Sequence, residues 1–306
     1  MSTKPRIIVI LGPTATGKSD LAVTIAKKHN GEVISADSRQ VYKHLDIGTG
    51  KITKKEMQRV PHHMLDVVSP TKIYSVFDWQ KSAEKCITDI LNRGKLPIIC
   101  GGTGFYIQSI VDGIVLPEVP PNAKLREKLD GKTPVELVAI LQTYDRHILE
   151  TIDTKNPARL VRAIEIAEHL GSVPPLQKKS SQYNILQIGL TLSKEGLSEK
   201  IHTRLLRRLK AGMVREAEKL HERGLSWKRM LSLGLEYRYL ALFLTGNISR
   251  SEFIQTLSKE IEQYAKRQIT WFKRDTRIQW FKPTDITEIE ICVSGFLDSR
   301  PISEYK

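Results

Sequence analysis

The chain has 306 residues, of which 40% are hydrophobic and 27% charged, and this is the composition of an ordinary soluble protein. No apolar run approaches the roughly 20 residues that cross a bilayer, and the first residues leave no room for a signal peptide. Three widely separated cysteines exclude both a disulfide framework and a zinc site. We therefore expect a protein of the reducing cytoplasm that has no contact with a membrane.

The formal net charge of +14 is unevenly distributed along the chain. Residues 200–282 contain 19 lysines and arginines but only 8 aspartates and glutamates. A solvated helix surface is the ordinary explanation of a charge run, but such a surface mixes both signs. Because this excess has one sign and is interleaved with aromatic side chains, it favours a polyanionic partner, nucleic acid before membrane.

The first hundred residues alternate between strand and helix patterns. Residues 6–11 are a continuous apolar run of strand length, helical periodicity follows over residues 18–29, and residues 32–35 predict a second strand. Ser75 begins a capping box at the start of another helix, and residues 96–100 predict a third buried strand. This alternation indicates an α/β fold in which helices cover both faces of a parallel sheet.

The alternation stops after the third strand. Several prolines between residues 117 and 121 mark a boundary, after which the pattern is only helical. We expect residues 117–184 to form a helical insertion domain, because a strand pattern resumes at residues 185–192. The core then consists of residues 1–116 and 185–306, with basic helices in its C-terminal part.

A phosphate-binding loop follows the first strand. The segment GPTATGKS fits the P-loop pattern G-x-x-x-x-G-K-[ST], with a strand before it and a helix after it. The glycines let successive backbone N–H groups turn toward an anion, and the helix N-terminus adds partial positive charge. Lys18 reaches the terminal phosphate and the Ser19 hydroxyl can bind Mg²⁺. The expected phosphate-binding residues are Gly12, Thr14, Ala15, Thr16, Gly17, Lys18 and Ser19.

The loop alone does not specify which phosphate ester is bound. ATP is the usual ligand, but hydrolysing P-loop enzymes carry a second strand that ends in Asp for the metal. Here residues 96–100 end in Gly-Gly-Thr-Gly, and a carboxylate follows the second strand instead, as Asp37. This arrangement weakens the ATPase interpretation. Two alternatives remain open, a P-loop small-molecule kinase that uses ATP and a P-loop RNA-binding protein without enzymatic activity.

Two polar turns are expected at the same edge of the sheet as the P-loop. Asp37 begins the turn DSRQVY after the second strand, and GGTGFY follows the third. Open α/β sheets bind ligands at the carboxyl ends of their strands. Taken alone, the glycine-rich turn would be a helix start with Thr103 as its N-cap. Three convergent polar turns favour a binding site over coincidence.

These motifs occur in the order seen in bacterial tRNA dimethylallyltransferases, and the chain resembles that family over nearly its whole length. Between the turns DSRQVY and GGTGFY lie DIGTGK from Asp46, VPHHMLD from Val60 and YSVFD from Tyr74. The segment PARLVRAIE from Pro157 lies in the expected insertion, and AKRQITWFKR from Ala265 lies near the C-terminus. The joint order of these motifs is far more specific than any one of them.

The resemblance implies that the P-loop and Mg²⁺ hold dimethylallyl diphosphate rather than ATP. The acceptor would be N6 of the adenosine that follows the anticodon of tRNA, and the target base would flip into a pocket. A general base suits this chemistry, because the lone pair of an adenine amino group is delocalised into the ring. The resemblance makes Asp37 that base and Thr103 a contact to tRNA and diphosphate.

The resemblance also implies an arginine that neutralises the leaving diphosphate beside Lys18. Arg208 is the best match, and Arg204 and Arg207 are alternatives because the helix is shorter here than is usual in the family. We expect a monomer. The tRNA contacts implied by the resemblance are Asp37, Ser38, Arg39, Gln40, Thr103, Arg126, Arg159, Arg162, Arg267 and Gln268.

Overall fold

The structure, a computed structural model that describes residues 4–299, divides into two compact units. One unit comprises residues up to Gly113 together with those from Ser180 onward, and the other comprises Ile114–Lys179. The sequence pattern predicts the insertion at residues 117–184, a few residues later at both ends than the structure shows. The N-terminal difference arises from the short strand Ile114–Val115, which belongs to the smaller unit and has no distinctive pattern.

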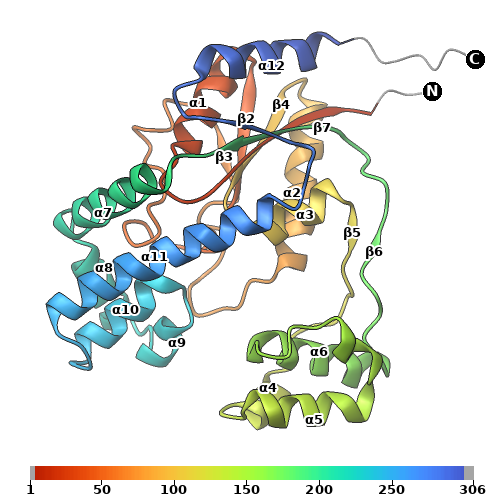
Figure 1. The fold of residues 1–306 in the computed structure, drawn as a ribbon, viewed down its shortest axis with the longest axis vertical. Coiled ribbons are helices and arrows are strands. Elements are labelled where there is room, and N and C mark those ends of the chain that lie inside the picture. Colours follow the sequence, from red (N-terminus) through yellow and green to blue (C-terminus); the bar gives the residue numbers. More distant parts are fainter. Residues whose placement is uncertain (1–3, 300–306) are drawn as a thin grey trace, which may run out of the picture. The chain divides into compact units, whose positions relative to one another are not determined.

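The larger unit is built on a six-stranded sheet in the order β3-β2-β4-β1-β7-β8, in which every pairing is parallel (Figure 1). The chain moves from β1 outward past β4 to β2, and later crosses to β7 on the other side of β1. The carboxyl end of β1 is therefore a point where the strand order reverses, which is where such sheets bind ligands. The strands are β1 (Arg6–Leu11), β2 (Gly31–Ala36), β3 (His62–His63), β4 (Leu96–Gly101), β7 (Asn184–Leu190) and β8 (Ile278–Phe281).

Helices cover both faces of this sheet. Alternate residues of β1 point to opposite faces, so Ile8 and Ile10 pack with α1 and α12, whereas Ile7 and Val9 pack with α2, α3 and α11. Because both faces are buried, the central strands are continuous apolar runs, and this is why they were predictable from sequence. These helices are α1 (Lys18–Lys28), α2 (Val76–Asn92), α3 (Gly104–Val111), α11 (Arg250–Phe272) and α12 (Ile286–Asp298).

The predicted start of α2 is confirmed. Ser75 accepts a hydrogen bond from the backbone N–H of Asp78, and the Asp78 carboxylate accepts one from the backbone N–H of Ser75. The edge strands β3 and β8 and the last helix α12 were not predicted. Both strands are short and carry polar residues, so they lack the apolar run that identified the central strands.

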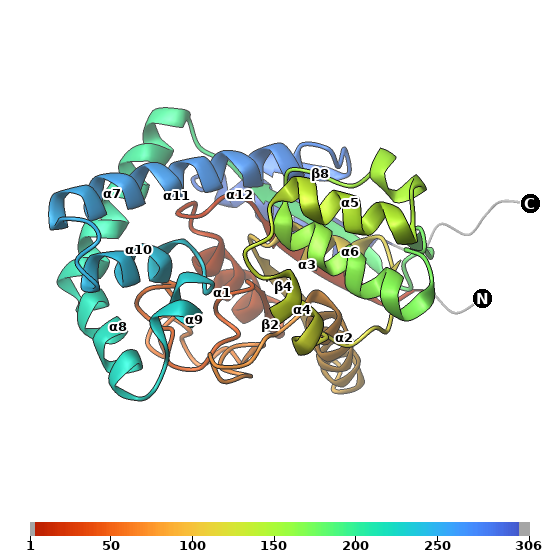
Figure 2. The same cartoon turned by 90° about the horizontal axis from the view of Figure 1, so that it is seen from below.

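The C-terminal basic segment forms a group of helices beside the sheet, in which α10 packs against α11, and α8 and α9 pack against α10 (Figure 2). Helix α7 follows β7 directly and packs against α8 and α11. These helices carry most of the one-sided positive charge noted in the sequence. Their bounds are α7 (Lys194–Lys210), α8 (Met213–Glu222), α9 (Trp227–Leu231) and α10 (Leu235–Leu244).

The smaller unit has a core of its own. Leu137 and Leu141 of one helix pack against Leu160 and Ile164 of another, all nearly inaccessible to solvent. Two short strands, β5 and β6, pair antiparallel where the chain enters and leaves the unit. Its elements are β5 (Ile114–Val115), α4 (Ala123–Leu129), α5 (Pro134–Tyr144), the 3-10 turn His147–Glu150, α6 (Pro157–Leu170) and β6 (Gln177–Lys178).

Candidate active site

The segment from Gly12 to Ser19 forms a compact turn between β1 and α1. Gly12 has φ of 139°, and a Cβ at this position would clash with the carbonyl oxygen of Leu190 in the neighbouring strand. Gly17 has φ of 86° and precedes α1 as an N-cap that makes no side-chain cap hydrogen bond. The N–H groups of the first helical turn are therefore left for a ligand or solvent.

The Lys18 side chain contacts the backbone of this turn. Its Nζ donates a hydrogen bond to the Pro13 carbonyl oxygen at 2.6 Å. Burial lowers the pKa of Lys18 to about 8; the Arg204 guanidinium adds to this shift, whereas the Asp37 carboxylate opposes it. Burial disfavours the charged form of a lysine, and a bound anion stabilises that form again. Lys18 should therefore bind an anion favourably.

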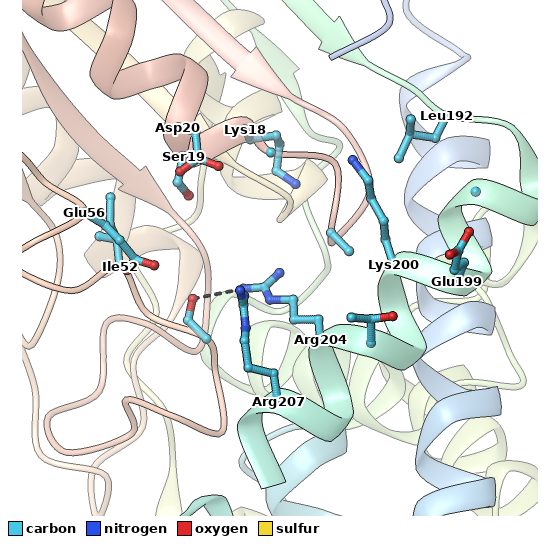
Figure 3. A pocket seen from close by; sticks show the side chains of 15 residues that line it. Lys18, Ser19, Asp20, Ile52, Glu56, Leu192, Glu199, Lys200, Arg204 and Arg207 are labelled. Carbon is cyan, nitrogen blue, oxygen red and sulfur yellow. Dashed lines mark hydrogen bonds between the residues drawn. The ribbon is translucent and has the colours of Figure 1, made fainter. Parts of the chain in front are cut away.

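A cavity of about 560 Å³, here called the P-loop cavity, opens beside the turn. Figure 3 shows Lys200, Arg204 and Arg207 of α7 directing their charged ends toward the space into which Lys18 also points. Cations arranged around one space suit a ligand with several negative oxygens. The cavity is lined by Ala15, Gly17, Lys18, Ser19, Asp20, Gly50, Ile52, Glu56, Leu192, Gly196, Glu199, Lys200, Thr203, Arg204 and Arg207.

A second cavity of about 390 Å³, here called the Asp37 cavity, lies on the other side of the same lysine. Lys18, Ser19 and Arg204 line both cavities. A ligand held at the P-loop would therefore border each of them. The Asp37 cavity is lined by Thr14, Lys18, Ser19, Asp37, Ser38, Arg39, Gln40, Thr49, Cys100, Gly101, Gly102, Arg204, Ser232, Gly234, Leu235, Glu236, Arg238, Ile261, Tyr264, Arg267 and Gln268.

The Asp37 side chain is held by its own turn. Its Oδ1 accepts hydrogen bonds from the backbone N–H groups of Arg39 at 2.8 Å and Gln40 at 3.3 Å. The other oxygen, Oδ2, accepts no hydrogen bond from residues 4–299, so it is available to a ligand. Thr103 supports the turn from the neighbouring strand end, because its Oγ1 accepts a hydrogen bond from the Ser38 N–H at 3.0 Å.

The arginines of α7 have different partners. Arg204 donates to Thr14 Oγ1 at 3.3 Å and to the Gly50 carbonyl at 3.0 Å, and burial followed by the nearby Arg208 lowers its pKa. Arg208 is only 9% exposed and lines neither cavity. Its Nη1 donates to the Gly48 carbonyl at 2.7 Å and to Glu236 Oε1 at 3.2 Å. The geometry thus brings Arg204, with Arg207, to the P-loop, and not Arg208.

Comparisons with known proteins decide the family. A family model described as IPP transferase matches residues 40–275. The tRNA dimethylallyltransferase 2 of Treponema denticola is 46% identical over 289 residues, which cover 92% of this chain and 97% of that protein. The chain belongs to the IPP transferase family. The resemblance inferred from the motifs is confirmed.

Solved structures of this family share the fold. A tRNA isopentenylpyrophosphate transferase from Bacillus halodurans aligns with a TM-score of 0.73 and 36% identity, covering 96% of this chain and 97% of that one. A eukaryotic dimethylallyltransferase acting on tRNA aligns with a TM-score of 0.82 and 26% identity, covering 98% of this chain and 81% of that one. The expected α/β fold with a P-loop core is confirmed.

In this member of the IPP transferase family, α11 packs tightly on the glycine-rich turn after β4. A Cβ on Gly102 would clash with the Gln268 side chain, and a Cβ on Gly104 would clash with the ring of Trp271. The absence of side chains at Gly102 and Gly104 therefore allows α11 to pack directly against this turn. Arg267 lines the Asp37 cavity, and its guanidinium carbon lies 5.9 Å from the centre of the Tyr264 ring.

The loop at residues 46–51 contributes Gly50 to the P-loop cavity and Thr49 to the Asp37 cavity, and a single carboxylate holds this loop. Glu216 of α8 accepts hydrogen bonds from the backbone N–H groups of Asp46, Ile47 and Gly48 at 2.7–3.0 Å. The Tyr237 hydroxyl also donates to Glu216 at 2.6 Å. This anchor fixes the loop whose carbonyl groups bind Arg204 and Arg208.

The predicted tRNA-binding arginines of the insertion lie in the smaller unit. Arg126 and Arg162 both bind Glu165, which is 2% exposed, and each retains a 32% exposed side chain. Arg159 is 54% exposed and lies 3.8 Å from the Asp153 carboxylate. Arg126 and Arg162 therefore stabilise the unit internally, whereas Arg159 has its guanidinium largely free for a partner.

Several lining residues were missed by sequence reasoning. Lys200 precedes Arg204 by four residues, and this helical spacing was a signal that could have found it. Tyr264 also follows from spacing, since it precedes Arg267 by three residues on α11. Nothing local identified the chain from Ser232 to Glu236 or Arg238, which reach the Asp37 cavity through the tertiary fold.

Proposed function

We propose that this protein transfers the dimethylallyl group of dimethylallyl diphosphate to N6 of the adenosine that follows the anticodon of tRNA, releasing diphosphate. Curated relatives are named for dimethylallyl transfer to tRNA, and the chain covers nearly their whole length. The observation that carries the proposal is the pair of cavities that share Lys18, Ser19 and Arg204. The P-loop cavity is lined by the cations Lys18, Lys200, Arg204 and Arg207. The Asp37 cavity contains a carboxylate at the end of a parallel strand.

On the donor side, the diphosphate is held by the P-loop and α7. The N–H groups at the start of α1, Lys18 and Arg204 bind its oxygens, and Lys200 and Arg207 extend the positive surface. Ser19 fits a magnesium site, because Mg²⁺ in such sites takes one or two protein oxygens and fills its shell with phosphate and water. Within residues 4–299 no cluster of three or more acidic, histidine or cysteine side chains offers an all-protein site. Bound there, Mg²⁺ neutralises charge on the diphosphate.

On the acceptor side, the adenine enters the Asp37 cavity. The N6 lone pair forms a bond to the allylic C1, the C1–O bond breaks, and its electrons leave with the diphosphate. Asp37 Oδ2 takes the proton that N6 loses, which prevents a positive charge from remaining on the product. Lys18 and Arg204 stabilise the negative charge that develops on the bridging oxygen.

The tRNA itself is bound by basic side chains around the Asp37 cavity. Arg39, Arg238 and Arg267 line it, and the Tyr264 ring offers an apolar wall for a flipped base. Ser38 and Gln40 lie on the same turn as Asp37 and are placed to read the adenine edge. No helix among residues 4–299 is long and apolar enough to cross a membrane. By separate proposal, the enzyme acts as a monomer in the cytoplasm, where its tRNA substrate is found.

A label-transfer assay tests the function. Dimethylallyl diphosphate labelled in its carbon chain should transfer label to unmodified tRNA, and the label should be found on the adenosine 3′ to the anticodon. The Asp37→Asn variant should bind the donor normally but transfer about 10²–10⁴-fold more slowly, because the amide cannot accept the proton.

The same assay separates the alternatives. Transfer of label from the γ-phosphate of ATP to a small molecule would support the kinase. Binding of tRNA without any transfer would support the RNA-binding protein. An Asp37→Asn variant with undiminished transfer would rule out the assigned base.

A further inference from the structure

Gln268 lies in the middle of α11 and uses both ends of its amide. Its Oε1 accepts a hydrogen bond from the Thr14 N–H at 2.9 Å, and its Nε2 donates to the Gly102 carbonyl at 2.9 Å. The orientation of the amide is fixed by its partners, since an N–H must meet an oxygen and a carbonyl must meet a donor. The side chain is 6% exposed, so little of it remains for any other contact.

The two partners belong to different turns, the P-loop and the turn after β4. Thr14 is part of the P-loop, and its hydroxyl accepts a hydrogen bond from Arg204. Gly102 directly precedes Thr103, which holds the turn of Asp37 through the Ser38 N–H. A continuous path of hydrogen bonds and backbone therefore runs from the diphosphate-binding arginine to the turn of Asp37, and Gln268 is its central link.

The packing leaves this link little freedom. Gly102 has no side chain, and the Gln268 amide occupies the space where one would be. Trp271, one turn further along α11, occupies the corresponding space over Gly104. Because α11 packs directly on backbone atoms of these turns, a change in the Gln268 amide should shift the turns themselves. Gly102 and Gly104 have no side chain that could adjust instead.

We propose that Gln268 is a positioning residue that sets the distance between the bound diphosphate and Asp37, rather than a side chain that contacts tRNA. The inference rests on the proposed function, because it concerns alignment of the same donor and acceptor. Displacement of a reacting group by about 1 Å can cost about 10²-fold in rate. The rate of the chemical step should therefore be more sensitive to Gln268 than is the affinity for either substrate.

The first test is Gln268→Leu, which keeps the approximate size of the side chain and removes both hydrogen bonds. Single-turnover transfer at saturating donor and tRNA should slow by about 10²-fold, with tRNA affinity changed by less than about threefold. Gln263 is exposed on the same helix, so Gln263→Leu is the matched control and should behave as wild type.

The second test is the pH dependence of Gln268→Glu. A neutral carboxyl group has one O–H donor and one carbonyl acceptor, so it can replace both hydrogen bonds of the amide. The ionised form cannot donate to Gly102 and places a negative charge beside the donor site. Burial favours the neutral form of such a carboxyl, and the transfer rate relative to wild type should rise by up to about tenfold for each pH unit lowered through the pKa of the introduced group.

The outcomes are decisive in both directions. An unchanged single-turnover rate for Gln268→Leu, or a loss confined to tRNA affinity, overturns the proposal, and so does a flat rate ratio for Gln268→Glu. If the leucine variant does not fold, the pH profile of the glutamate variant decides alone. Absence of transfer by the wild-type enzyme would refute the proposed function instead, and this result is distinct from all the others.

Discussion

Lys18 shows how a single residue can be tuned for an anionic ligand before that ligand arrives. The side chain lies where the P-loop cavity and the Asp37 cavity meet, with Arg204 nearby. Desolvation and a neighbouring cation both disfavour its charged form, and a diphosphate reverses both effects. The proton on Lys18 is therefore linked to donor binding.

This linkage predicts how donor affinity depends on pH. Burial lowers the pKa of free Lys18 to about 8, and a bound diphosphate must raise it. Below pH 8 the lysine is already protonated, so donor affinity should not depend on pH through this group. Above pH 8, binding must recruit a proton, and the Kd of dimethylallyl diphosphate should increase by up to about tenfold per pH unit.

Calorimetric titration of the donor in the absence of tRNA measures this dependence. A Lys18→Arg variant is the control, because its guanidinium stays charged throughout the range and the pH dependence should disappear. A wild-type Kd that stays constant between pH 7 and 10 would show that Lys18 does not gain a proton when the donor binds.

At the scale of elements, α7 combines a packing role with a ligand-facing role. Leu197, Ile201, Leu205 and Arg208 form its buried stripe, whereas Lys200, Arg204 and Arg207 face the P-loop cavity. Neighbouring residues on a helix point about 100° apart, so adjacent positions cannot share a function that depends on direction. Periodicity thus separates Arg207 from Arg208, but Arg204 and Arg208 are four residues apart and lie on nearly the same side of the helix. Their tertiary partners, and not periodicity, distinguish these two arginines.

The different partners of Arg204 and Arg208 predict opposite consequences when each arginine is removed. Arg204→Ala should weaken donor binding by about 10- to 100-fold, since hydrogen bonds from a charged group are each worth about 1.5–3 kcal/mol. Arg208→Ala should leave donor affinity nearly unchanged but lower the free energy of unfolding by on the order of 2 kcal/mol, because Glu236 and the Gly48 carbonyl lose their partner. Donor titration and thermal unfolding of both variants measure these effects. The reverse pattern would assign the diphosphate to Arg208.

The sequence was most informative where structure depends on local pattern. The P-loop, the central strands, the capping box at Ser75 and the helical character of the insertion all follow from spacing and burial within a few residues. Contacts between distant segments were not predictable in this way. Gln268 lies 254 residues from Thr14, and Glu216 lies 168–170 residues from the loop it anchors. Both residues look like ordinary polar helix positions until the fold brings their partners near.

At the scale of the whole molecule, positive charge is present in both units. The net charge of +14 gives long-range attraction to a polyanion, but attraction alone does not identify which side chains contact it. In the smaller unit, Arg159 is the exposed candidate for a tRNA contact. Arg126 and Arg162 instead form ion pairs with Glu165. Exposure therefore distinguishes a binding arginine from a structural one.

Arg159 can be tested through the salt dependence of tRNA binding. Each phosphate contact contributes about 0.7–0.9 to the slope of log Kd against log salt concentration. Arg159→Ala should reduce the slope by about that amount and weaken tRNA binding, with donor affinity and thermal stability unchanged. Asp153→Ala removes the nearby carboxylate and should leave tRNA binding equal or tighter. Arg162→Ala should mainly lower thermal stability, because it removes the hydrogen bonds to Glu165 and to the Val119 carbonyl. An unaltered salt slope in Arg159→Ala would exclude this arginine from the tRNA interface.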